Sequence, residues 1–190
     1  MIPKDEIASP GYYSCVLDSI RCELTVTAHC ALHRYRFEKD SGKVVIDFSN
    51  NGLNIPGTLK KKADVKSLKS IDESTVSAKI LAEGITLFFA IKSNVPITPK
   101  RKRAVCLADG SKTVELSVSV SLRSEEKAIG FLNEAGDFDS VKESAYSTWN
   151  DALSKIHIET KDEETKQIFY SNLYHSLIKP CDRSGESFVY

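Results

Sequence analysis

The strongest constraint on the fold is the strict alternation of apolar and polar residues in VELSVSVSL, residues 114–122. Such a period of two is typical of a β-strand, in which successive side chains point to opposite faces of the sheet. The apolar face consists of Val114, Leu116, Val118, Val120 and Leu122. The polar face consists of Glu115, Ser117, Ser119 and Ser121. We therefore expect a strand here with one face against a hydrophobic core.

The segment before this strand also favours β-structure. AVCLA (104–108) is followed by DGSK, in which Asp109-Gly110 suits a tight hairpin loop. We predict an antiparallel hairpin over 104–122. Further strand candidates recur about every ten residues between turn signals, a spacing typical of an antiparallel sandwich. They are 11–18, 21–37, 43–49, 75–84 and 85–93.

The periodicity becomes helical after residue 123. Ser124 is a suitable N-cap for EEKAIGFLNEAG. A second helix is indicated by apolar residues at three- and four-residue steps, which bury the lone tryptophan. They are Phe138, Val141, Ala145, Trp149, Ala152 and Ile156. A third helix is expected to begin at TKDE, where Thr160 and Glu163 have capping-box spacing, and to end at Pro180.

Composition is that of an ordinary globular protein. The chain has 190 residues, 27% charged and 41% hydrophobic, with 26 basic and 26 acidic side chains. This balance gives no general attraction to nucleic acid or to a membrane surface, and we expect neither as a partner. The longest apolar runs, such as ITLFFAI (85–91), are too short to span a bilayer. The N-terminus has no signal-peptide pattern, so the chain as written would stay in the cytoplasm.

Several residue groups could carry chemistry, but each has a simpler explanation. His29 and His33 lie about 13 Å apart in an extended chain, too far for one metal ion. A turn between them would let them approach, but no third ligand is visible nearby. Five cysteines without CxxC spacing indicate free, mostly buried thiols rather than zinc or a disulfide framework.

Charged clusters have structural explanations as well. The basic runs 59–66 and 100–103 lack the interleaved aromatic residues of a single-strand surface and suit a solvated hairpin rim. The acidic residues of GDFD (136–139) and KDEET (161–165) stand at expected helix N-termini, where capping explains them. The chain thus contains no complete catalytic group and no predicted metal site.

Two separated segments resemble glycoside hydrolase family 92, the calcium-dependent exo-α-mannosidases. ASPGYYSCVLDSIRCELTVTAHCALHRYRF (8–37) is similar to the family segment in which SPGYYSV, ELTAT and GLHRYTF follow one another. WNDALSKIHIET and IFYSNLYHSLIKPCDRSGE are similar to its tryptophan helix, short extended segment and FYT-LYH helix ending in proline. The resemblance covers roughly residues 8–185, and 50–112 match only in strand pattern.

The resemblance implies an incomplete, supersandwich-like β-sandwich in residues 1–123, linker helices in 124–159 and the first helix of an (α/α)6 barrel in 160–190. It implies removal of terminal α-mannose from glycans, by inversion and with calcium, with an expected preference for α-1,2 linkages. The catalytic carboxylates and most of the calcium site would lie in the missing remainder of the catalytic domain. We therefore expect a fragment that is inactive alone. Family members are often secreted or periplasmic, so the location of the complete protein stays open.

The chain departs from the family pattern at a few positions. His29 stands where many members have arginine, and Ala31 stands where they usually have glycine. CDRSGESFVY differs from the commoner SDVDGxY text, and the resemblance places Asp182 and Glu186 near the sugar-binding mouth of a complete enzyme. We keep both as candidate substrate-binding residues.

Two other functions remain open at this point. A stand-alone carbohydrate-binding sandwich would need an aromatic platform, for which Tyr12, Tyr13 and Tyr35 are the clustered candidates. A basic interaction module would use Lys100 to Arg103 to bind nucleic acid in a salt-sensitive way.

Overall fold

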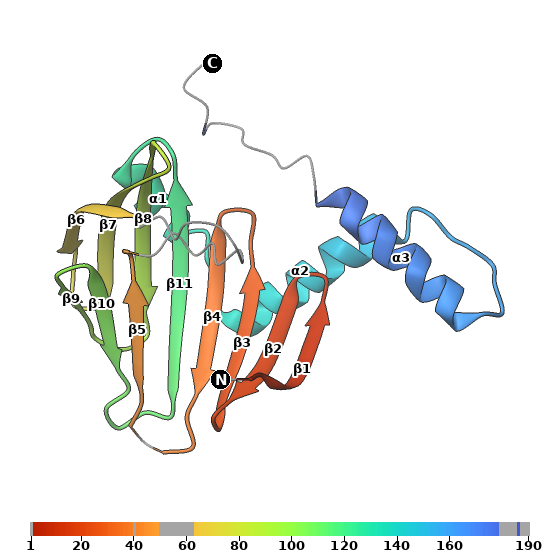
Figure 1. The fold of residues 1–190 in the computed structure, drawn as a ribbon, viewed down its shortest axis with the longest axis horizontal. Helices are drawn as coiled ribbons and strands as arrows, with labels where there is room; N and C mark the ends of the chain where they lie inside the picture. Colours follow the sequence, from red (N-terminus) through yellow and green to blue (C-terminus); the bar gives the residue numbers. More distant parts are fainter. Residues whose placement is uncertain (1, 40, 50–62, 179–185, 187–190) are drawn as a thin grey trace.

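The computed structural model describes residues 2–39, 41–49, 63–178 and 186. Within them the chain forms strands first and helices afterwards (Figure 1). The strands are β1 (Lys4–Ser9), β2 (Tyr12–Leu17), β3 (Ile20–Val26), β4 (Cys30–Arg36), β5 (Lys43–Asp47), β6 (Asp64–Ser70), β7 (Thr75–Ala82), β8 (Ile85–Ser93), β9 (Ile97–Lys100), β10 (Arg103–Leu107) and β11 (Thr113–Ser121). The helices are α1 (Glu125–Leu132), α2 (Phe138–Leu153) and α3 (Glu163–Leu177).

The strands form two antiparallel sheets. The large sheet has the order β1-β2-β3-β4-β11-β8-β7-β6, and the small sheet has the order β5-β10-β9. Figure 1 shows the small sheet stacked against the β11–β6 half of the large sheet, beside strands β1 to β3, which the small sheet does not cover. The expected antiparallel β-sandwich followed by helices is therefore confirmed.

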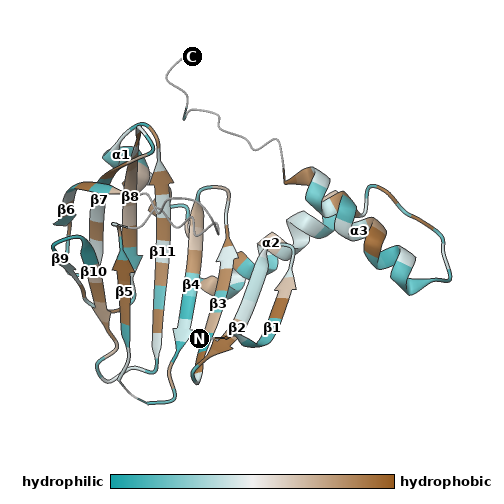
Figure 2. Ribbon diagram, in the orientation of Figure 1, coloured by the Kyte–Doolittle hydropathy of each residue, from teal (hydrophilic) through white to brown (hydrophobic). Residues whose placement is uncertain are grey.

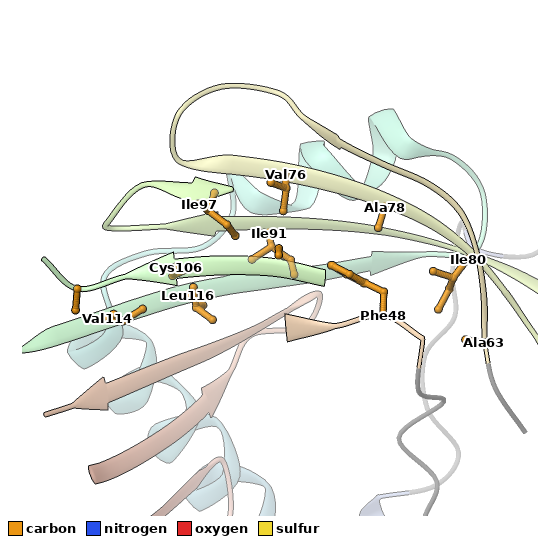
Figure 3. Packing of buried hydrophobic residues seen from close by; sticks show 12 residues of the cluster. Phe48, Ala63, Val76, Ala78, Ile80, Ile91, Ile97, Cys106, Val114 and Leu116 are labelled. Atoms are coloured by element: carbon orange, nitrogen blue, oxygen red, sulfur yellow. The ribbon is translucent and has the colours of Figure 1, made fainter. Parts of the chain in front are cut away.

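The main core lies between the two sheets (Figure 3). Alternate residues of β11, namely Val114 and Leu116, are 0% and 3% exposed and contribute to this core. Ile91 of β8 is 1% exposed, and Cys106 of β10 faces it from the other sheet. Complete burial of one such aliphatic side chain contributes about 1.5–3 kcal/mol, so this layer holds the sandwich together.

The opposite face of the large sheet is covered by helices. Ala128, Phe131 and Leu132 of α1 form a second core with strand residues that include Leu32 and Ala90. The serines of β11 lie in this interface: Ser119 is fully buried, and its Oγ lies 2.6 Å from the backbone oxygen of Ala128 in α1. Small hydroxyl side chains thus let the helix approach the sheet closely while their own polar groups stay satisfied.

The predicted hairpin over 104–122 is wrong. β10 pairs with β5 and β9 in the small sheet, whereas β11 pairs with β4 and β8 in the large sheet. The turn at Gly110, whose φ is +71°, reverses the chain but carries it from one sheet to the other. The physical reason is that both strands are apolar on one face, and these faces bury more surface when they stack across the core than when they lie side by side.

Other strand boundaries also differ from the prediction. Segment 21–37 forms two strands, β3 and β4, because the chain turns at Thr27, whose Oγ1 accepts a hydrogen bond from the Cys30 amide at 2.9 Å. The strands β1, β6 and β9 were not predicted from the sequence. Their short or irregular apolar patterns are those of strands near sheet edges, where β1 and β6 end the large sheet and β9 ends the small one.

The helix starts are set by local capping. Ser124 accepts a hydrogen bond from the Lys127 amide, which confirms the predicted cap of α1. Helix α3 begins after Asp162 rather than with a Thr160–Glu163 capping box, because the Asp162 carboxylate accepts from the amides of residues 164 and 165. The helix ends at its C-cap, Ile178. The predicted stop at Pro180 lies outside the described residues.

Figure 2 shows mixed polar and apolar colouring along all three helices. In the part of the chain that the structure describes, no helix has the length and apolar character needed to cross a bilayer.

Candidate functional site

The junction between the large sheet and the helices is organised by Arg34 of β4. Its side chain is 8% exposed, and its two terminal nitrogens donate to the two carboxylate oxygens of Asp139 in α2, at 2.9 Å each. Its Nε donates to Glu115 of β11 at 2.6 Å. The guanidinium also lies 4.1 Å from the centre of the Phe138 ring. One side chain therefore connects two strands to the start of α2.

The electrostatics of this group favour the ionised forms. The hydrogen bond from Arg34 lowers the pKa of Asp139, although the carboxylate is 72% exposed. In turn, the hydrogen bond to Asp139 raises the pKa of Arg34 most strongly, with Glu115 adding to it. Asp139 is thus an ion-pair partner rather than the helix cap expected from the sequence. Asp137 is the cap, since it accepts from the Ser140 amide at 3.0 Å.

A second polar group lies nearby on β2 and β3. Glu23 is 6% exposed, and its Oε1 accepts a hydrogen bond from the Tyr12 hydroxyl at 2.9 Å. Its Oε2 lies 3.3 Å from Nε of Arg36, but without the geometry of a hydrogen bond. Ser14, directly opposite Glu23, also has a buried hydroxyl oxygen without a hydrogen-bond partner in the protein. This face of the sheet therefore holds buried polar groups beside α2.

A cleft of about 580 Å³ runs between α2 and the β3–β4 turn. Its lining includes Ser140, Ser144, Thr148 and Trp149 of α2, together with Glu134. Glu134 is the one acidic residue among those lining residues, and its Oε2 lies 2.7 Å from Nδ1 of His29. The cleft therefore offers an aromatic ring and hydroxyls, but not the two carboxyl groups that glycoside hydrolysis uses.

Helix α2 reaches the sheet because of a glycine. Gly11 has a φ of +78°, and a Cβ at this position would lie 2.9 Å from the Ala145 Cβ and 3.1 Å from the Trp149 ring. Glycine adopts such backbone angles without strain and leaves room for the helix. Trp149 is half-buried and meets the edge of Tyr174 in α3, with ring centroids 4.8 Å apart. This aromatic pair is one of the contacts that connect α3 to the rest of the chain.

Helix α3 is the least buried of the helices. None of its residues is buried, and Ile168 and Leu177 are 55% and 43% exposed. An apolar groove of about 500 Å³ runs along it and is lined by Ile156, Thr165, Ile168, Phe169, Asn172, Leu173 and Ser176. His175 is exposed and contacts the neighbouring Tyr174 ring.

Glu186, one of the two predicted substrate-binding residues, contacts the start of α1. Its carboxylate accepts from the Leu122 amide at 2.5 Å and from the Ser121 hydroxyl at 3.0 Å, and it pairs with Lys127 at 3.0 Å. Burial opposes its ionisation, but these hydrogen bonds outweigh burial and lower its pKa. The other predicted residue, Asp182, lies outside the described residues. Sugar binding by either residue stays a prediction.

The three tyrosines proposed as a sugar-binding platform do not share one surface. Tyr12 and Tyr13 are adjacent in β2 and point to opposite faces of the sheet. Tyr12 is covered by Lys142, whose Nζ lies 4.1 Å from the ring centre. Tyr35 hydrogen-bonds to His33 at 2.9 Å and packs against the main core. The prediction of a sugar-binding platform built from these three tyrosines is therefore wrong.

The two histidines and the basic run 100–103 also lie apart from the candidate site residues described above. His29 stacks on Phe131 of α1, whereas His33 faces the space between the sheets, where burial lowers its pKa. Across the described ranges, no group of three or more histidine, cysteine, aspartate or glutamate residues could hold a metal ion. The basic residues 100–103 form the β9–β10 turn, where Arg103 pairs with Asp47 at 2.9 Å. Residues 59–62 of the other basic run lie outside the described part.

Sequence reasoning missed the Arg34 group entirely. The residues that Arg34 joins are 81 and 105 positions away, and none of them belongs to a local motif. The available signal was an arginine that continues the alternating row of Cys30 and Leu32 in β4.

Comparison with known proteins gives one family. The family model described as the glycosyl hydrolase family 92 N-terminal domain matches residues 1–159. A curated relative from Arthroderma benhamiae, called an uncharacterized secreted glycosidase, is 24% identical over 231 aligned residues, which include 95% of this chain and 29% of the relative. The chain thus spans less than a third of the length of that relative.

Two solved structures with the same fold are described as family GH92 mannosidases. The family GH92 α-mannosidase BT3965 from Bacteroides thetaiotaomicron has a TM-score of 0.74 at 20% identity, covering 90% of this chain and 27% of that one. The GH92 inverting mannosidase BT2199 from the same organism has a TM-score of 0.74 at 19% identity, covering 92% and 26%. At such identities the similarity shows the fold.

Proposed function

Because this chain belongs to glycosyl hydrolase family 92 through its N-terminal domain, we propose that it is the sandwich and linker part of an enzyme that removes terminal α-mannose residues from glycans. The observation that carries the proposal is the family match over residues 1–159, together with a fold shared with mannosidases. In this proposal the glycan is the substrate of the complete enzyme. The present chain is a scaffold for it and is inactive alone.

The state of the acidic residues supports a role without catalysis. A general acid needs a raised pKa, so that it holds its proton near neutral pH. The pKa values of Asp137, Asp139, Asp162 and Glu186 are all lowered instead, each by hydrogen bonds that it accepts as a cap or an ion-pair partner. These side chains are suited to holding helices in place. The general acid of the reaction would therefore come from outside this chain, and we propose the same origin for the base.

The mechanism of the complete enzyme follows from the proposed family activity. Hydrolysis with inversion needs two carboxyl groups about 6.5–9.5 Å apart, with room for the attacking water between them. The relative BT2199 is named as an inverting mannosidase, which supports inversion here. A preference for α-1,2 linkages is the narrower part of the proposal.

Calcium is proposed as a cofactor of the complete enzyme only. The residues described here do not fit a calcium site, because they contain no cluster of three or more of the acidic, histidine or cysteine side chains considered as ligands. No step of the reaction is therefore assigned to calcium in this chain. Its ligands would be supplied by the catalytic domain.

The C-terminal helix supports the proposed domain boundary. The family match ends at residue 159, next to the predicted start of the catalytic domain at 160. Helix α3 buries no residue against this chain and has an apolar groove, as expected for the first helix of a barrel that packs against further helices. We therefore assign 124–159 to the linker and 160–190 to the start of the (α/α)6 catalytic domain.

The proposed enzyme would act outside the cytoplasm. The Arthroderma benhamiae relative is named as a secreted glycosidase, which supports this location. A location outside the cytoplasm also fits mannose-containing glycans as the substrate class.

Two assays test the proposed function. This chain alone should not hydrolyse an aryl α-mannoside, with or without calcium. A gene product extended by the catalytic domain should hydrolyse it and should lose activity when calcium is chelated. Turnover by the present chain would contradict the assignment of catalysis to another region. An extended enzyme that cleaves other glycosides but not α-mannosides would contradict the substrate.

A sugar titration separates this function from that of a stand-alone binding module. The purified chain should show no saturable binding of mannose or mannobiose by calorimetry. Saturable binding, lost when Trp149 is replaced by alanine, would favour the module, because Trp149 is the aromatic residue that lines the cleft beside α2.

A further inference from the structure

Two cysteines face each other across a β-hairpin. Cys15 of β2 and Cys22 of β3 are directly opposite in the antiparallel register. The hairpin between them is closed by Asp18 and Ser19, whose φ angles of 44° and 71° are typical of a two-residue primed turn. Because such a turn fixes the register, the two cysteines are held opposite each other in the folded chain.

The Cα spacing expected from this register allows a disulfide. Directly opposite residues of an antiparallel pair have Cα atoms about 4.5–5.5 Å apart, and disulfides span about 4.4–6.8 Å. Both side chains point to the same face, since opposite residues share a face of the sheet. Both thiols are free in this structure.

The two thiols differ in access. Cys15 is 4% exposed, whereas Cys22 is half-buried. They lie on the face of the large sheet that carries Tyr35, on strands that the small sheet does not cover. Cys22 is therefore the thiol that a small reagent can reach first.

The surroundings keep Cys22 protonated at neutral pH. Burial raises the pKa of its thiol, and the charge and hydrogen bond of Cys15 raise it further. The other titratable groups facing this pair are Tyr13 and Tyr35. The pKa of Tyr13 is raised first by its hydrogen bond to Glu6 and then by Cys15, and the pKa of Tyr35, about 12, reflects burial first and then Cys22 and Cys106. Since the thiolate is the attacking species, reaction at Cys22 should become faster as the pH rises from neutral.

We propose that Cys15 and Cys22 form a reversible cross-strand disulfide when the protein meets a small disulfide such as oxidised glutathione. The Cys22 thiolate attacks one glutathione sulfur and releases one glutathione thiolate, which takes up a proton. Cys15 then loses its proton and attacks the Cys22 sulfur of the mixed disulfide, which releases the second glutathione. In total the two protein thiols lose two electrons and two protons, and one oxidised glutathione becomes two reduced molecules.

The other described cysteines are arranged differently. Cys30 lies on the helix-covered face, where its Sγ is 3.1 Å from the Phe131 backbone oxygen and burial raises its pKa to about 11. Cys106 is fully buried in the small sheet. Neither is opposite another cysteine in the strand register. The inference concerns the sandwich itself and is independent of the proposed enzymatic function.

The test combines thiol counting with peptide mapping. The folded chain is incubated with oxidised glutathione at mildly alkaline pH, then alkylated and digested with trypsin. The wild type should lose two reactive thiols and show peptide 5–21 linked to peptide 22–34. Because peptide 22–34 also contains Cys30, Cys30→Ser serves as the matched control and should give the same link.

A second variant tests the order of the steps. In Cys15→Ala the Cys22 mixed disulfide cannot be resolved by its neighbour, so one glutathione should remain on Cys22. In the wild type this adduct should be transient. The link should also disappear on treatment with excess dithiothreitol and form again on reoxidation.

Several results would overturn the proposal. These are a folded wild type that forms no 15–22 link, a link lost in Cys30→Ser, or a glutathione adduct on Cys22 that persists equally in the wild type and in Cys15→Ala. If Cys15→Ala does not fold, the wild type and Cys30→Ser still decide the question, because their linked peptides identify the bonded pair.

Discussion

Helices α1 and α3 differ sharply in how they are held. Helix α1 has eight residues and buries Ala128, Phe131 and Leu132 against the large sheet, whereas α3 has 15 residues and buries none. Both have a capped N-terminus and acidic residues in the first turn. Local sequence signals therefore form a helix in each case, but only α1 gains stability from packing within this chain.

The largest difference should appear when one phenylalanine is removed from each helix. Phe131 of α1 is 8% exposed, so Phe131→Ala should lower the free energy of unfolding by about 3–4 kcal/mol. Phe169 of α3 is only half-buried, and Phe169→Ala should cost less than about 1 kcal/mol. Urea unfolding followed by circular dichroism measures both. Equal losses would mean that α3 is as firmly packed as α1.

Replacing the arginine that holds α2 should have the next largest effect. Arg34→Met keeps the length of the side chain but removes its bonds to Asp139 and Glu115, and we expect a loss of about 2–3 kcal/mol. Arg103→Met is the control, because Arg103 is 62% exposed in its ion pair with Asp47. Its loss should stay below about 1 kcal/mol. Similar losses for both variants would show that burial of Arg34 contributes nothing.

The close approach of α2 can be tested at one glycine. Gly11→Ala adds both backbone strain and a contact 2.9 Å from Ala145, and should cost about 2 kcal/mol. Gly84→Ala is the control, because Gly84 has a similar φ of +81° but no atom within 4 Å of the added Cβ. It should cost about 1 kcal/mol from strain alone. If the two variants unfold at the same urea concentration, α2 moves away from the sheet without loss.

Removing the two aspartate caps should separate global from local stability. Asp137→Ala at α2 should lower the unfolding free energy by about 1 kcal/mol, because this helix start is packed on the sheet. Asp162→Ala at α3 should leave the main unfolding transition unchanged and lower only the helical signal before it. A shift of the main transition by Asp162→Ala would show that α3 unfolds together with the sandwich.

The smallest effect should come from pH. The folded-state pKa of Asp139 lies below its ordinary value of 3.8, so its ion pair adds stability above about pH 4 and loses it as the pH falls through the lowered value. The urea midpoint of the wild type should therefore fall more than that of Arg34→Met between neutral pH and about pH 3. Carboxylates that do not contact Arg34 titrate in both proteins and cancel in the comparison. Parallel curves would contradict the contribution of Asp139.

Much of the fold could be predicted because its signals are local. The alternation in β11 and the cap at Ser124 each depend on residues only a few positions apart, and both are confirmed. The fold class and the family followed from these patterns and from two matched segments. Capping explained Asp137 and Asp162, so the sequence also indicated that these carboxylates are structural.

The other features of the fold and of the candidate site could not be predicted, because they depend on contacts between residues that are far apart in the sequence. Asp139 has the same local setting as Asp137, but Arg34, 105 positions away, binds it. The sequence predicts a polar face at Ser119 and Ser121, yet both are buried on the side of the sheet that α1 covers. The pattern cannot distinguish the two cases, because small side chains fit equally well against solvent or a helix. The segment 104–122 has every local mark of a hairpin, and only the stacking of the two sheets separates its strands.

The contact of Glu186 with Leu122 makes the helical part of the chain a closed loop of 64 residues. In polymer terms, the entropy cost of closing such a loop grows only with the logarithm of its length, by about 0.6 kcal/mol for each doubling. Segments inserted between α3 and Glu186 would therefore weaken this attachment very little. A tag that lengthens this loop should for the same reason leave the contact between Glu186 and Leu122 nearly unchanged.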